Sequence, residues 1–212
     1  MTLSRVPGGA RAGAAPDAFE RAVRALRAVR LRADVALTEV PAPARIAPHA
    51  VALAGDVVSE GEELATGRFI LLHDPAAPAE WGGTFRVVTY VRADLEPEVG
   101  ADPMLGQVGW SWLEDALREH GALAAGVGGT VTRVLSEGYG ALADRPPSVD
   151  VEVRASWTPL AAGTDAGTGG AGGAGAPFEV GAHLEAWSLL LCTVAGLPPL
   201  PEGVSALPRP QR

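Results

Sequence analysis

Histidine and aspartate side chains offer the most recognisable chemistry in this chain. His73 is followed directly by Asp74, and a carboxylate can orient an imidazole for proton transfer. Neighbouring residues of a strand point to opposite faces, so the pair needs the Asp74-Pro75 turn in order to converge. The alternative interpretation is a structural role at the end of a strand.

The candidate binding site combines this pair with arginines and tryptophans on or near the central strands. Trp81 and Trp110 are expected in loops, where a tryptophan can rim a ligand groove or a partner site. The six candidate residues are Arg68, His73, Asp74, Trp81, Arg86 and Trp110.

Other catalytic and metal-binding patterns find no support. The four histidines show no HxH or HExxH spacing, and Cys192 is the single cysteine, so we expect no metal site and no cofactor. Ser111 lacks the second glycine of a GxSxG motif, and Ser111 with Glu114 matches a helix capping box. The acidic segment 94–107 has no EF-hand register, and we interpret it as a solvated loop.

Composition narrows the class of partner. The net charge is -8, and all 17 basic residues are arginine, a bias typical of a GC-rich genome. The acidic balance argues against nucleic-acid binding, although the arginines between Arg21 and Arg32 leave a basic helix as the alternative. No apolar stretch resembles a signal sequence or a membrane span, so we expect a cytoplasmic protein that binds no membrane.

Hydrophobic periodicity predicts an α+β fold. Helices are expected from Asp17, from Ser111 to Gly121 and over 178–195. Alternation predicts strands over 34–40, 50–58, 64–73, 84–93, 126–138 and 149–158. Because strands follow one another in runs, we predict a largely antiparallel sheet of about five or six strands with helices packed on one face.

The chain divides into one domain and two tails. Residues 1–15 are expected to be a disordered N-terminal tail, and residues 16–199 a single α+β domain. Within it, the Gly/Ala-rich segment 161–177 is expected to be a flexible insertion. Residues 200–212 form a Pro-rich C-terminal tail.

Several sequence motifs occur together in one order. They are ELATGRFILLHDP, W-x-GTFR-x-VT, DLEPE, DP, VGWSWL and RASWTP. Over residues 17–199 the chain resembles the DUF3000 family of uncharacterised actinobacterial proteins. The resemblance implies a cytoplasmic actinobacterial protein and supplies no catalytic residue.

Two functions of different class remain. The first is a non-enzymatic protein-binding or adaptor module, acting with a protein partner or as a homodimer. The alternative is an enzyme or small-molecule-binding protein with a site near His73 and Asp74 on the central sheet. That alternative requires at least three of five residues to converge around one deep pocket: Arg68, His73, Asp74, Arg86 and Trp110.

Overall fold

A computed structural model describes residues 17–100, 102–161 and 178–198 of the 212-residue chain. The predictions for both tails and for the Gly/Ala-rich insertion fall outside these residues. The elements run in this order: α1 (Asp17–Ala28), β1 (Val35–Val40), β2 (His49–Ser59), β3 (Glu62–His73), β4 (Phe85–Leu95), α2 (Pro97–Gly100), α3 (Leu105–Glu119), β5 (Ala124–Ser136), a 3-10 turn (Gly140–Leu142), β6 (Ser148–Pro159) and α4 (Val180–Val194).

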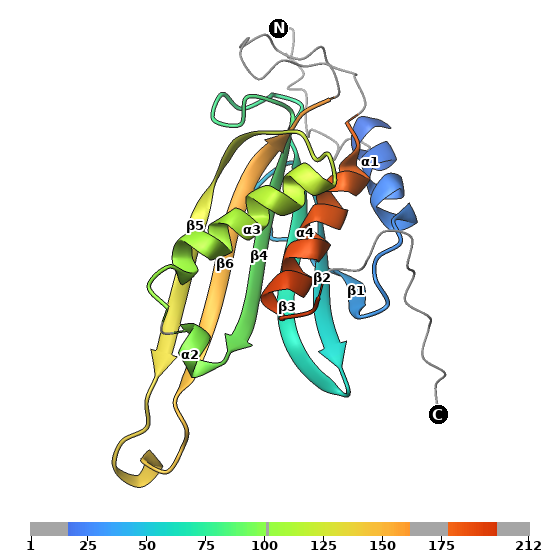
Figure 1. The fold of residues 1–212 in the computed structure, drawn as a ribbon. Helices are drawn as coiled ribbons and strands as arrows, with labels where there is room; N and C mark the ends of the chain where they lie inside the picture. The colour runs from blue at the N-terminus through green and yellow to red at the C-terminus, as the bar shows by residue number, and fades with distance from the viewer. Residues whose placement is uncertain (1–16, 101, 162–177, 199–212) are drawn as a thin grey trace, which may run out of the picture.

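The six strands form one antiparallel sheet in the order β1-β2-β3-β4-β6-β5. Strand β6 lies between β4 and β5, so the last hairpin turns back and leaves β5 at the edge (Figure 1). In β6, every second residue from Val149 to Trp157 is buried, and the residues between them are less buried. The predicted α+β class and antiparallel sheet are confirmed.

The helices lie on one side of this sheet (Figure 1). Helix α4 packs on β2, β3 and β4, α3 packs on β5 and on α4, and α1 packs on α4. The core fills the space between the two layers, and its largest fully buried side chains are Trp157, Trp187 and Phe69. No described helix is long and apolar enough to span a membrane.

Two glycines let α4 approach the sheet closely. Gly55 and Gly67 are paired across β2 and β3, and the Trp187 ring lies directly over both. A Cβ atom at Gly55 would lie 2.6 Å from Trp187 Cη2, so a larger residue has no room. The Trp187 indole N–H donates a 3.3 Å hydrogen bond to the Tyr90 carbonyl, which attaches α4 to β4 as well.

The predicted start of the middle helix was wrong. Helix α3 begins at Leu105, six residues before Ser111, and the Ser111 hydroxyl donates to the Val108 carbonyl inside the helix. The Glu114 carboxylate accepts a hydrogen bond from the Trp110 indole, one turn earlier. The Ser-x-x-Glu spacing therefore reflects contacts within a helix and not a capping box.

The acidic segment is also more regular than predicted. Strand β4 continues to Leu95, α2 occupies Pro97–Gly100, and the first turn of α3 follows. The Asp102 carboxylate accepts the Met104 backbone N–H and so turns the chain into α3. Because α3 starts early, Trp110 lies in a helix and not in a loop.

Candidate functional site

His73 and Asp74 belong to separate local structures. His73 is 3% exposed on the helix-covered side, and its ring centroid lies 4.4 Å from that of Phe85. Its Nδ1 atom is buried without a hydrogen-bond partner, and burial, followed by the nearby His49, lowers the pKa of His73. The Asp74 carboxylate accepts the Ala76 backbone N–H in the following turn. The imidazole is thus a neutral core group. Among the described residues no hydrogen bond joins it to Asp74, whose negative charge only partly offsets the lowering of the His73 pKa.

Arg86 and Trp81 meet through Thr158 on the side of the sheet that carries no helices. The Arg86 guanidinium donates to the Thr158 hydroxyl at 3.1 Å, to the Ser156 hydroxyl at 2.7 Å and to the Gly126 carbonyl at 3.2 Å. The Thr158 hydroxyl in turn donates to the Trp81 carbonyl. Arg86 therefore joins β4 to β6 and to the irregular start of β5, which is a structural role.

The six candidate residues do not form one pocket. Arg68 and Arg86 point away from the helices, whereas His73 points toward them, because Arg68 and His73 are an odd number of residues apart on β3. Trp110 lies on α3, packed against the core. Among the described residues, the arrangement that the enzymatic alternative required is not formed.

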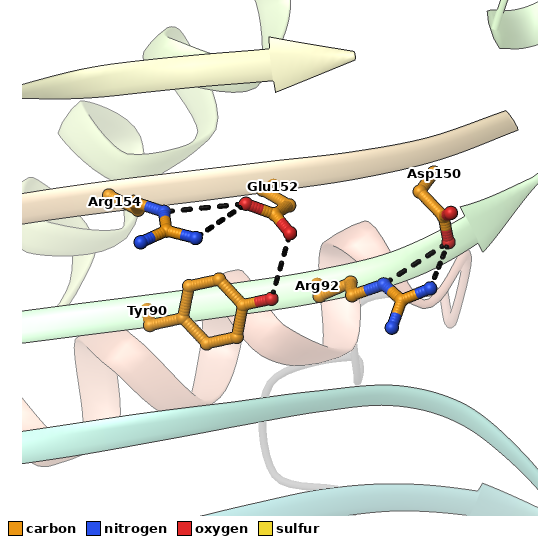
Figure 2. A network of polar contacts seen from close by, with 5 residues as sticks. All are labelled: Tyr90, Arg92, Asp150, Glu152 and Arg154. Atoms are coloured by element: carbon orange, nitrogen blue, oxygen red, sulfur yellow. Dashed lines mark hydrogen bonds and ion pairs between the residues drawn. The ribbon is translucent and has the colours of Figure 1, made fainter. Parts of the chain in front are cut away.

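The helix-free side, here called the open face, carries a ladder of polar side chains on β4 and β6 (Figure 2). The Tyr90 hydroxyl donates to Glu152 Oε1 at 3.1 Å, and the Arg154 guanidinium donates to Glu152 Oε2 at 2.8 Å. Arg154 also lies over the Tyr90 ring, 4.9 Å from its centroid. These contacts hold the Tyr90 ring and the Arg154 side chain in fixed positions beside each other.

The ladder continues toward the far end of the two strands. Arg92 donates to Asp150 Oδ1 at 2.8 Å (Figure 2). Asp94 lies opposite Asp150 in the register. A hydrogen bond with Asp150 raises the pKa of Asp94, and the same bond, together with Arg92, lowers the pKa of Asp150. Arg92 is therefore paired with a carboxylate on the neighbouring strand, and Arg154 with a carboxylate on its own strand.

Arg68 is different from these arginines. It lies opposite Tyr90 in the register, it is exposed, and it has no hydrogen-bond or ion-pair partner among the described residues. Beside it is a hollow of about 300 Å³ lined mainly by Arg68, Ile70, Val88, Tyr90 and Arg154. We call this feature the Arg68 hollow. It combines a free guanidinium with an aliphatic floor and an aromatic wall.

The electrostatics of the Arg68 hollow favour an anion. The hydrogen bond from Arg154 lowers the pKa of Glu152, so this carboxylate stays ionised. Its negative charge is already paired with Arg154. Burial, followed by the bond to Glu152, raises the pKa of Tyr90, which stays a neutral phenol. Arg68 is left as the uncompensated charge, and its planar guanidinium can bind a carboxylate through two hydrogen bonds.

The chain is similar to one known protein family. A model described as "Protein of unknown function (DUF3000)" matches residues 15–205. The chain belongs to the DUF3000 family. The match confirms the resemblance seen in the motifs. No curated protein and no solved structure matches this DUF3000 chain.

Within the part of this DUF3000 chain that the structure describes, no group of three or more His, Cys, Asp or Glu side chains could hold a metal ion. The sequence pointed to Arg68 but missed Tyr90, Ile70, Val88 and Arg154. A signal for them exists in the alternation of β3 and β4, since residues 68 and 70 share a face, as do residues 88 and 90. The position of Arg154 depends on β6 lying beside β4, which alternation does not reveal.

Proposed function

We propose that this protein is a non-enzymatic cytoplasmic binding module whose open face holds an acidic, extended segment of a partner protein. The observation that carries the proposal is the unpaired guanidinium of Arg68 at the centre of the sheet. An actinobacterial origin is part of the same proposal, and it is supported by 17 arginines with no lysine.

The charges on the open face indicate that the bound segment of the partner is acidic. On the open face, Arg92 and Arg154 are paired with Asp150 and Glu152, whereas Arg68 has no carboxylate. Arg68 is a local positive charge in a protein of net charge -8, and unlike the unpaired Arg21 on α1 it borders a hollow of the sheet. A glutamate or aspartate of the partner would complete the pairing that the neighbouring arginines already have.

The size of the Arg68 hollow favours a side chain over a whole metabolite. Its volume of about 300 Å³ is at the lower limit of ligand cavities, which bury most of their ligand. Ile70 and Val88 offer an aliphatic floor to apolar residues that flank the carboxylate. In an extended segment residues two positions apart share a side, so the matching segment carries aliphatic residues two positions from its acidic residue.

The test is a titration with a defined peptide. A fluorescein-labelled peptide in which leucines stand two positions before and after a glutamate is expected to bind, and its glutamine analogue to bind much more weakly. Arg68→Gln should weaken binding by roughly ten- to a hundred-fold, the loss of one charged hydrogen-bonding pair. Arg21→Gln is the matched control, because Arg21 is an exposed arginine on α1 that also lacks a partner among the described residues.

The NMR signals of individual residues distinguish binding at the Arg68 hollow from nonspecific electrostatic attraction. In amide NMR spectra the peptide should shift the signals of Ile70, Val88 and Tyr90 and leave those of α1 unchanged. Equal binding by the native chain and Arg68→Gln, or shifts confined to the helix side, would contradict the proposal.

A further inference from the structure

Strand β5 is a long edge of the sheet, and beyond the irregularity between Ala125 and Gly128 it carries little of the usual protection against pairing. It has 13 residues, no proline and one charged residue, Arg133. The opposite edge, β1, has six residues and is followed by Pro41. A long edge strand offers unpaired backbone N–H and C=O groups to another strand, so natural proteins shorten, charge or cover such strands. Strand β5 is thus open to strand addition.

Exposed apolar side chains gather around this edge. Seven of the eleven large hydrophobic residues that are exposed in the described chain come from α2, the residue before α3, α3, β5 and the β5–β6 connection: Val99, Met104, Val108, Val134, Leu135, Tyr139 and Leu142. The elements are in contact, because Gly109 of α3 faces Val131 and the Arg133 guanidinium donates to the Asp102 carbonyl at 2.7 Å. A concentration of apolar surface beside an open edge is typical of an interface.

We propose that two copies of this chain associate by antiparallel pairing of their β5 strands. The segment Thr130-Val131-Thr132 is the same in both directions, so a two-fold axis through Val131 pairs Val131 with itself. The same axis pairs each Thr130 with Thr132 of the other copy. Threonine pairs and β-branched pairs stabilise antiparallel strands.

The charges on β5 are compatible with a second copy as the occupant. Two molecules of net charge -8 repel each other, but β5 contains no acidic residue. In the proposed register Arg133 lies opposite Gly129, so like charges are not brought together. Antiparallel pairing continues the sheet through both molecules and leaves both open faces on the same side. The dimer therefore leaves the Arg68 hollow uncovered, and its test is independent of peptide binding there.

The first measurement is the mass of the full-length protein by light scattering after gel filtration. The expected value is twice the chain mass of 21.7 kDa. Two double variants then test the register. Thr130→Glu with Thr132→Glu, and Thr130→Lys with Thr132→Lys, each place like charges opposite each other in the dimer. Each variant alone should be monomeric, and an equimolar mixture should recover the dimer through Glu–Lys pairs.

The two variants are matched within the fold. Thr130 lies opposite Arg154 and Thr132 opposite Glu152 on β6, so each variant gains one favourable and one unfavourable neighbour. The control is Ala36→Glu with Thr38→Glu on the other edge, which should stay dimeric. Circular dichroism establishes that each variant is folded.

Three results would overturn the inference. A monomeric mass for the native protein would show that β5 does not pair with a second copy of this chain. Dimers that persist in both charged variants would place the interface elsewhere. Folded variants whose mixture stays monomeric would exclude the pairing around Val131.

Discussion

Replacing Gly67 by alanine tests how α4 holds the strands that carry the open face. A Cβ atom at this position would lie 2.6 Å from the Tyr90 carbonyl oxygen and 3.0 Å from Trp187 Cζ2. The first neighbour is backbone, so the strand itself must move to relieve the overlap. We expect Gly67→Ala to lower the free energy of unfolding.

The magnitude follows from two contributions. Overpacking of a well-packed core costs about 1–3 kcal/mol. The shift of Tyr90 also weakens the hydrogen bond from the Trp187 indole, which adds about 1 kcal/mol. Gly55→Ala should cost less, because the atoms it meets belong to the edge of the Trp187 ring. Trp187→Phe should therefore make Gly55→Ala less harmful but should not rescue Gly67→Ala.

Urea unfolding followed by circular dichroism measures these differences. Gly106→Ala is the matched control, because Gly106 lies in α3 with no atom within 4 Å of the added methyl group. It should stabilise the helix by up to about 1 kcal/mol. If Gly67→Ala were as stable as Gly106→Ala, the close approach of α4 to the glycine pair would be refuted.

Three further predictions concern buried or bridging groups. The Trp157 indole donates to His183 Nδ1 at 3.0 Å, and burial lowers the pKa of His183 to about 4, so the unfolded chain takes up this proton first as the pH falls. Unfolding free energy should then fall by about 3 kcal/mol between pH 6.5 and pH 4, and His183→Gln should remove that part of the pH dependence in urea titrations; an unchanged slope would contradict it. In the same assay, Arg86→Met should lower the free energy of unfolding by about 1–3 kcal/mol, because the Ser156 and Thr158 hydroxyls lose a charged hydrogen-bond donor. An unchanged free energy of unfolding would show that Arg86 does not bridge the strands. Cys192 is 1% exposed and burial raises its thiol pKa to about 11, so Ellman's reagent should label it only after unfolding, and rapid labelling of the native protein would argue against a buried position.

Much of the fold could be predicted from the sequence because strand alternation is a local property. The pattern from Val149 to Trp157 gives β6 directly, and the run of strands before the second helix indicates an antiparallel sheet. The start of α3 could not be predicted in the same way. Ser111 and Glu114 imitate a cap, and the local turn at Asp102 that does start the helix is a weaker pattern.

The candidate site was only partly predictable, for a different physical reason. Arg68 was identified as an arginine on a central strand, but its lack of a partner depends on what lies on the neighbouring strands. Tyr90 is engaged by Glu152 and Arg154 on β6, about 60 residues later in the chain. His73 was also identified, yet tertiary packing against Phe85 places it in the core. Residue type and spacing contain no information about such long-range neighbours.

The central claim is that Arg68 holds an acidic segment of a partner on the open face. The most direct measurement is the affinity of the glutamate–leucine peptide for the native chain, Arg68→Gln and Arg21→Gln, by fluorescence anisotropy at two salt concentrations. We predict salt-sensitive binding that Arg68→Gln weakens by roughly ten- to a hundred-fold and that Arg21→Gln leaves unchanged. Equal affinity for all three proteins would contradict the claim.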